Sequence, residues 1–411
     1  MQLKRYYSII ENFLSLSLFK AIDAIIPLLI IPYLIKVVGE ENYGIYAFAY
    51  ALIFYFMNIV QYGFTLSGVR IIALNRAHPL KLNQSYNNIF TTQLYLTLFV
   101  LIVLLVLILT IDTFRVHYQI YLFFLILIIG EFLTPFWFFL GVEKMRFITI
   151  INLLSKSSFA ILTFFLINSK SDYVFISLYQ SIGFLVSGLF AQIIIIYSFK
   201  IKFKIAPLKN VIATLKEGFS SFLTLITPTI YSNTSVFLIG IFGAPQYVSY
   251  MQIGTKVSGA FSVLNTILTS VFYPLINRKK YLFKRIRYIF LGIGLALSFI
   301  MYFFSDILLR LWLPGDPVEI IQTVKLLSPT PFLASVISCY GVNYLMVLNK
   351  DQLYMRIVLI GSVSGLILGL LLIPKYYYVG GAICIVSARG VKALLSFYYS
   401  YKLSKNKTNE I

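Results

Sequence analysis

The chain has 411 residues, of which 59% are hydrophobic, 17% aromatic and only 12% charged. A soluble domain carries about 25% charged residues, so this chain has too few polar side chains to cover itself in water. The composition therefore excludes a soluble globular protein and a disordered one. Its 34 Lys and Arg against 14 Asp and Glu give a net charge of +20. On so apolar a chain, this excess indicates cations on the cytoplasmic side of a membrane rather than a nucleic-acid binder.

Long apolar segments follow one another along the whole chain. A helix needs roughly 20 apolar residues to cross the hydrocarbon layer, and these runs lack the alternation of barrel strands. We therefore predict an all-α integral membrane protein with about twelve transmembrane helices. The predicted segments are 13–36, 43–73, 88–111, 118–141, 147–168, 172–199, 217–242, 246–276, 288–309, 324–348, 353–373 and 379–401.

The loops between these segments carry unequal numbers of cations on the two sides. Twenty-two Lys and Arg fall on the side that holds both termini, among them Lys4, Arg5, Lys407 and the five lysines of 200–216. Six fall on the other side, namely Lys36, Arg115, Lys170, Arg310, Lys325 and Lys375. This bias predicts that the N- and C-termini are both cytoplasmic.

The loops are too short for an extramembrane domain, and the longest outer connection covers 306–323. The sequence contains no HExxH, GxSxG or Walker A pattern. Cys339 and Cys384 lie inside apolar runs, and the two histidines have no second ligand at metal-binding spacing. We therefore expect no enzyme activity, no metal and no cofactor. Any chemistry must then take place within the membrane, or the protein performs none and moves something across it.

An internal repeat divides the chain near its middle. A shift of about 204 residues places Gly39, Tyr43 and Tyr46 on Gly243, Tyr247 and Tyr250, each set between two long apolar segments. We predict an N-terminal six-helix lobe (1–199), a basic cytoplasmic linker (200–216) and a C-terminal six-helix lobe (217–411). Because each lobe has an even number of helices, both lobes enter the membrane from the same side, and the two halves are parallel repeats. Helix breakers interrupt the first and seventh segments, at Pro27, Pro32 and Pro228, and either a gating role or simple bending explains them.

Eight charged residues of the predicted segments are candidate site residues, because charge inside the membrane is costly and marks candidate functional sites. Lys20 and Asp23 lie on one face of the first segment at i, i+3 spacing, and they can form a pair. Lys256 lies deep in the eighth segment, with no carboxylate near it in sequence. Arg70 lies close to the cytoplasmic end of the second segment, where it either reaches the interface or faces a cavity.

The other four intramembrane charges are secondary candidates. Glu131 in the fourth segment and Lys156 in the fifth can pair and join the helices of one lobe. Arg389 and Lys392 both lie in the twelfth segment, and Lys392 is close enough to its end to reach the interface.

Several short motifs resemble one known family. They are Pro32-Tyr-Leu-Ile-Lys-Val-Val-Gly-Glu-Glu-Asn-Tyr-Gly-Ile-Tyr46, Gln61-Tyr-Gly-Phe64, Arg70, Lys216-Glu-Gly-Phe219, Gly240-Ile-Phe-Gly243 and Tyr273-Pro274. These motifs are similar to those of the polysaccharide transporters, or O-antigen repeat-unit flippases (Wzx-like), of the multidrug/oligosaccharidyl-lipid/polysaccharide exporter superfamily. The likeness covers most of the chain and is densest over 10–75 and 215–280.

The resemblance implies a flippase in the bacterial inner membrane that serves O-antigen and lipopolysaccharide biosynthesis. Its substrate would be an oligosaccharide joined through diphosphate to undecaprenol, turned from the cytoplasmic to the outer face. In such a fold, Lys20, Arg70 and Lys256, with Asp23 beside them, would line a central cleft and bind the diphosphate. A polysaccharide polymerase and a chain-length regulator are the further partners that the resemblance implies.

Two other functions compete with this one. A cation-coupled multidrug exporter of the same superfamily would need intramembrane carboxylates, for which Asp23 and Glu131 are the candidates. A membrane glycan polymerase or glycosyltransferase usually displays a large outer loop with catalytic residues, which this sequence lacks.

Overall fold

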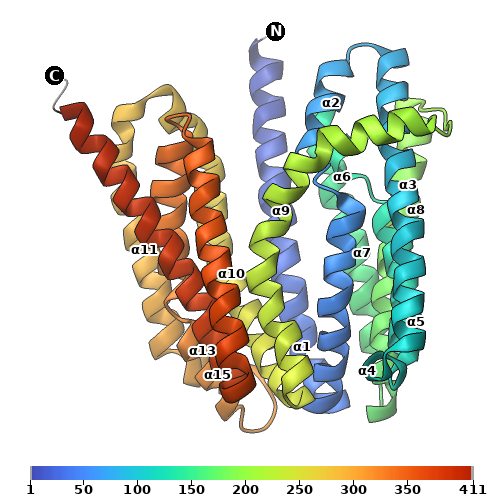
Figure 1. Ribbon diagram of the computed structural model, residues 1–411, viewed down its shortest axis with the longest axis vertical. Coiled ribbons are helices and arrows are strands. Elements are labelled where there is room, and N and C mark those ends of the chain that lie inside the picture. Colours follow the sequence, from blue (N-terminus) through green and yellow to red (C-terminus); the bar gives the residue numbers. More distant parts are fainter. Residues whose placement is uncertain (1, 409–411) are drawn as a thin grey trace. The chain divides into compact units, whose positions relative to one another are not determined.

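The computed structural model describes residues 2–408, with the side chains of 11, 12, 14–227 and 233–405. Every regular element in that part of the chain is a helix (Figure 1), which confirms the predicted all-α class. Lys4, Arg5, Lys407 and Pro228, used in the sequence predictions, lie outside the described side chains.

The helices are α1 (Gln2–Gln61), α2 (Ser67–Asn75), α3 (Pro79–Thr110), α4 (Asp112–Arg115), α5 (Tyr118–Phe132), α6 (Phe136–Gly141), α7 (Met145–Leu166), η1 (Lys170–Asp172), α8 (Tyr173–Phe199), α9 (Leu208–Phe242), α10 (Pro245–Arg278), η2 (Lys280–Leu282), α11 (Phe283–Phe303), α12 (Ser305–Trp312), α13 (Val318–Leu327), α14 (Thr330–Val336), η3 (Ile337–Met346) and α15 (Asp351–Thr408).

Nine helical stretches of the described chain are long and apolar enough to cross a membrane. Two of them, of 48 and 55 residues, are far longer than the roughly 20 residues that one crossing needs. Each of these two is broken internally, at Gly39 with a φ of 83° and at Tyr377 with a φ of 46°. Glycine adopts a positive φ without steric cost, whereas Tyr377 holds a conformation that is uncommon for a residue with a side chain. Both breaks therefore separate two helices within one continuous stretch.

The chain forms two compact units. Unit 1 consists of Met1–Ile26 and Ala49–Ile226, and unit 2 consists of Pro27–Phe48 and Thr227–Ile411. Helices α1 and α9 contribute to both units. The six-plus-six division at the 200–216 linker stays a prediction.

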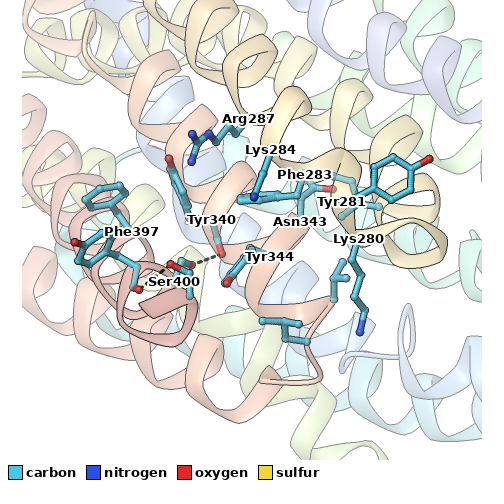
Figure 2. A pocket seen from close by; sticks show the side chains of 15 residues that line it. Lys280, Tyr281, Phe283, Lys284, Arg287, Tyr340, Asn343, Tyr344, Phe397 and Ser400 are labelled. Atoms are coloured by element: carbon cyan, nitrogen blue, oxygen red, sulfur yellow. Dashed lines mark hydrogen bonds between the residues drawn. The ribbon is translucent and has the colours of Figure 1, made fainter. Parts of the chain in front are cut away.

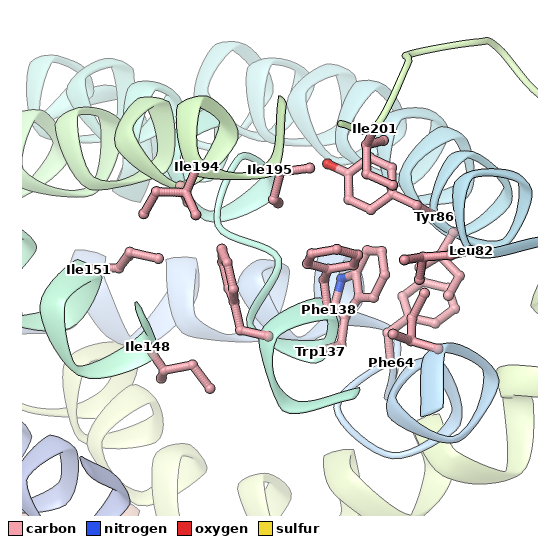
Figure 3. Packing of buried hydrophobic residues seen from close by; sticks show 14 residues of the cluster. Phe64, Leu82, Tyr86, Trp137, Phe138, Ile148, Ile151, Ile194, Ile195 and Ile201 are labelled. Carbon is pink, nitrogen blue, oxygen red and sulfur yellow. The ribbon is translucent and has the colours of Figure 1, made fainter. Parts of the chain in front are cut away.

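An aromatic core holds unit 1 together, and α8 packs against both α5 and α7. Phe64, Tyr86, Trp137 and Phe138 are buried side by side (Figure 3). Their polar atoms are satisfied inside this core. The Trp137 indole donates to Gln93 Oε1 over 2.9 Å, and the Tyr86 hydroxyl donates to Gln192 Oε1 over 2.8 Å. Internal partners of this kind are needed where no water reaches.

A polar stripe on α3 fixes the segment that follows α8. Asn83, Asn87 and Thr91 are spaced four residues apart, so they lie on one face of the helix. Their side-chain oxygens accept the backbone N–H groups of Lys202, Lys204 and Ala206 over 2.7, 3.1 and 3.0 Å. The extended, lysine-rich segment is thereby held along α3 without any secondary structure of its own.

Unit 2 brings the two copies of the repeated motif into contact. A Cβ atom at Gly44 would lie 1.8 Å from the carbonyl oxygen of Pro245, so the two backbones approach as closely as glycine permits. The aromatic pairs are alike, with ring centroids 5.8 Å apart for Tyr43 and Tyr46 and 6.2 Å apart for Tyr247 and Tyr250.

Candidate functional site

An ion pair lies between the first helix and α7 in unit 1. The Lys156 ammonium is 3.2 Å from the Asp23 carboxylate, and the two side chains are 16% and 53% exposed. The same ammonium lies over the Phe184 ring of α8, 5.9 Å from its centroid. Lys156 thus connects α1, α7 and α8. Its ammonium has partners within the protein, where lipid could not solvate the charge.

Glu131 forms the second acidic centre of unit 1. It is buried at the end of α5 and accepts a hydrogen bond from the Gln61 amide at the end of α1. The adjacent Gly130 explains the burial, because a Cβ there would lie 2.6 Å from the backbone of Phe184. The close approach of α5 and α8 leaves Glu131 with little room for water.

These contacts correct the pairing expected for Glu131. Lys156 pairs with Asp23 rather than with Glu131, whose hydrogen-bond donor is Gln61. Residue spacing shows which side chains share a face of one helix, but the rotation of neighbouring helices decides which faces meet. Gln61 was missed as a site residue, and the signal that could have found it is an amide close to the end of a long apolar segment.

Arg70 lies on α2 and pairs with Glu217 on α9 over 2.9 Å. Both side chains are largely exposed, at 64% and 48%. The two helices meet there because the Tyr62 and Phe222 rings stack with centroids 4.9 Å apart, beside the tight turn at Gly63. Arg70 therefore has an acidic partner that sequence reasoning did not identify.

The residues of the predicted cationic lining belong to different units, with Lys20 and Arg70 in unit 1 and Lys256 in unit 2. Lys20 is half-buried in unit 1, and Lys256 is half-buried on α10 in unit 2. A Cβ at Gly254 would lie 2.6 Å from Thr323, so that side of α10 packs on α13. Lys256 lies two residues later, about 200° further round the helix, and so faces away from α13. The joint lining by Lys20, Arg70 and Lys256 remains a prediction.

Two further candidate cations lie in α15. Lys392 is almost fully buried against Gly361, where an added Cβ would lie 2.3 Å from Lys392 Cγ. Arg389 Nη1 is buried and has no hydrogen-bond partner among the described residues. A buried donor without a partner costs free energy, so Arg389 is a candidate for binding an anion. Within the described chain, no group of three or more His, Cys, Asp or Glu could hold a metal ion.

Comparisons with known proteins agree with the family that the motifs indicate. A family model described as polysaccharide biosynthesis protein matches residues 9–280. A relative from Escherichia coli K12 named "Putative O-antigen transporter" is 28% identical over 92% of this chain and 94% of its own. A relative of the same name from Shigella dysenteriae is 24% identical over 94% of this chain and 98% of its own length.

Solved structures that share the fold include the following two. An inward-facing MATE family multidrug resistance transporter of the MOP superfamily matches with a TM-score of 0.65 at 14% identity, over 96% of both chains. The lipid II flippase MurJ in an inward closed conformation matches with a TM-score of 0.66 at 16% identity, over 96% of this chain and 86% of that one. At such low identity these matches establish the fold alone.

Proposed function

We propose that this chain, which belongs to the polysaccharide biosynthesis protein family, is a flippase for lipid-linked oligosaccharides. It moves polyprenyl-diphosphate-linked repeat units from the cytoplasmic to the outer face of the bacterial inner membrane, by alternating access and without covalent change. The observation that carries the proposal is the similarity to O-antigen transporter relatives along nearly the whole of both chains. The fold shared with a lipid II flippase supports it.

The charges inside the helices suit such a substrate. A diphosphate loses its water when it enters the membrane, and ammonium and guanidinium groups replace that water with charge-assisted hydrogen bonds. Lys20, Arg70 and Lys256 hold the headgroup, and Asp23, paired with Lys156, keeps part of unit 1 neutral. Arg389, whose buried Nη1 has no partner among the described residues, adds a further donor.

The topology of the proposal follows the charge bias. Twelve helices cross the membrane, in lobes 1–199 and 217–411 joined by the cytoplasmic linker 200–216, with both termini in the cytoplasm. Parallel six-helix lobes can open alternately to either side. The translocated units then pass to a polysaccharide polymerase and a chain-length regulator for lipopolysaccharide assembly.

The test is to deplete the chain from cells and determine on which face the lipid-linked oligosaccharide accumulates. We expect accumulation on the cytoplasmic face and loss of surface glycan, both reversed by the wild-type chain. Normal surface glycan and normal outer-face display after depletion would exclude a flippase role.

A cation-coupled multidrug exporter is the second candidate. The shared MATE fold and the buried carboxylate of Glu131 favour it, because a buried acid can exchange a proton or bind a cation during transport. Expression of the chain in a drug-sensitive strain separates the two functions. Raised resistance that Glu131→Gln abolishes would favour the exporter, whereas unchanged resistance together with restored glycan export favours the flippase.

A further inference from the structure

Unit 2 contains a pocket at the end where α10 finishes and α11 begins. Its volume is about 280 Å³, and its lining comes from α10, η2, α11, η3 and α15 (Figure 2). This size is at the small end for ligand sites, enough for a headgroup rather than a whole lipid. Lys280, Lys284 and Arg287 supply cationic side chains, and Tyr340 and Tyr344 supply aromatic ones. The pocket thus combines positive charge with apolar surface.

A π-helix builds one wall of the pocket. Tyr340, Asn343 and Tyr344 all belong to η3 and all line the pocket. The Asn343 amide donates to the carbonyl oxygen of Ser338, five residues earlier, over 2.9 Å. Ser400 of α15 donates to the carbonyl oxygen of Tyr340 over 3.0 Å. These side chains satisfy backbone groups of a wide helix, and π-helical turns of this kind often mark functional sites.

Two buried polar atoms at the pocket have no partner among the described residues. They are Asn343 Oδ1, on a side chain that is 0% exposed, and Arg287 Nε. The Arg287 guanidinium already donates one hydrogen bond, to the Tyr288 hydroxyl over 2.7 Å. Buried donors and buried acceptors are normally hydrogen-bonded, so each of these two atoms is expected to have a partner. A ligand that satisfies both must accept from the guanidinium and donate to the amide oxygen.

An exposed apolar stripe on α15 reaches the pocket. Leu394, Phe397 and Tyr401 are exposed and spaced three and four residues apart, so they share one face, and the last two line the pocket. Tyr281 is exposed at the opposite rim. Exposed tyrosines beside clustered cations are typical of a membrane–water interface. The stripe offers a path for an acyl chain into the bilayer.

We propose that this pocket binds the headgroup of an anionic glycerophospholipid of the phosphatidylglycerol class. The phosphodiester accepts from Arg287 and Lys284, and a headgroup hydroxyl donates to Asn343 Oδ1. Residues 278–287 contain six Lys and Arg and no carboxylate, on the predicted cytoplasmic side, where anionic lipids attract basic clusters. This lipid site is independent of the proposed transport function.

The chain offers a matched pair of variants for the test. Arg287 lines the pocket, whereas Arg285, two residues away and of the same charge, is exposed and does not. Purified full-length wild type, Arg287→Gln and Arg285→Gln are titrated with phosphatidylglycerol in detergent, and binding is measured by native mass spectrometry and by the shift in Tm. We expect about tenfold weaker binding for Arg287→Gln and unchanged binding for Arg285→Gln, because one charge-assisted hydrogen bond is lost.

Lys284→Gln serves as a second variant if Arg287→Gln fails to fold, with a smaller loss expected at this exposed cation. Equal binding by the pocket variants and Arg285→Gln would overturn the site. Equal stabilisation by phosphatidylcholine would overturn the requirement for negative charge, and equal stabilisation by inorganic phosphate would overturn the lipid as ligand. Preferential binding of polyprenyl phosphate would assign the pocket to the transported lipid instead and overturn the proposal.

Discussion

The two units treat charge inside the membrane differently. In unit 1, the Asp23 carboxylate pairs with the Lys156 ammonium, and the Glu131 carboxylate accepts a hydrogen bond from the neutral Gln61 amide. In unit 2, the chain from 227 onward places its carboxylates at helix ends or in loops, while Lys256, Arg389 and Lys392 lie within helices. Unit 1 therefore contains carboxylates within its helices that have partners in the protein, whereas the part of unit 2 from 227 onward has only cations there, which suit an anionic ligand. Changes to the internal pairs of unit 1 should therefore affect stability as well as export, whereas changes to the cations of unit 2 should affect export alone.

The largest effect is expected from reversing one charge of the unit 1 ion pair. Lys156→Asp places two carboxylates together in a low-dielectric site, so we expect at least about tenfold loss of glycan export. Because Asp23 is half exposed, the accompanying loss of stability should be about 1–2 kcal/mol. Surface glycan and the Tm of the purified protein measure the two effects.

The reciprocal exchange is the control for that prediction. Asp23→Lys combined with Lys156→Asp restores an ion pair of reversed polarity, and we expect export to recover in part. Wild-type export by Lys156→Asp alone, at a normal membrane level, would show that the pair has no role in export.

A smaller effect, confined to export, is expected for the central cation of unit 2. Lys256→Gln should lower export about tenfold while the protein reaches the membrane at its normal level, since an intramembrane charge faces a cavity or ligand by default. Lys256→Arg should retain most export because the charge remains. Lys209→Gln, at an exposed lysine of the basic segment, is the matched control. Equal export by both glutamine variants would remove Lys256 from the site.

The next effect concerns stability rather than export. Glu131→Leu leaves the Gln61 amide buried without its acceptor, which should lower the free energy of unfolding by about 1–3 kcal/mol. Glu131→Gln should change the free energy of unfolding by less than about 0.5 kcal/mol, because the new amide accepts the same bond. It can also donate to Gln61 Oε1, which has no partner within the described part of the chain. Thermal unfolding in detergent measures both. Equal stability of the two variants would mean that the Gln61 contact contributes nothing.

The smallest effect is expected at the exposed pair of unit 1. Arg70 and Glu217 should be coupled by less than about 1 kcal/mol, because water and salt screen exposed charges. A double-mutant cycle with Arg70→Gln and Glu217→Gln, repeated at high salt, measures the coupling. A coupling several times larger that persists in high salt would show that the pair is buried in the membrane-embedded protein.

Much of this fold follows from the sequence, whereas the contacts of the site do not. Apolar runs locate the helices, and Gly39 signals a break because glycine accepts a positive φ. The break at Tyr377 falls between the predicted segments 353–373 and 379–401, although no glycine marks its position. The Asp23–Lys156 pair depends on how α1 and α7 are rotated, which the spacing within one helix cannot reveal. The side-chain contacts of the π-helix η3 were equally hidden, because Ser400, which donates to the Tyr340 carbonyl oxygen, lies 60 residues away in the sequence.

Reconstitution of the purified chain tests the central claim most directly. Vesicles carry a polyprenyl-diphosphate-linked oligosaccharide on their inner leaflet only, and an external lectin reports its arrival on the outer leaflet. We predict that wild type transfers the lipid faster than protein-free vesicles do, and that Lys256→Gln transfers it about tenfold more slowly than wild type. Transfer by correctly folded wild type at the rate of protein-free vesicles would contradict a flippase.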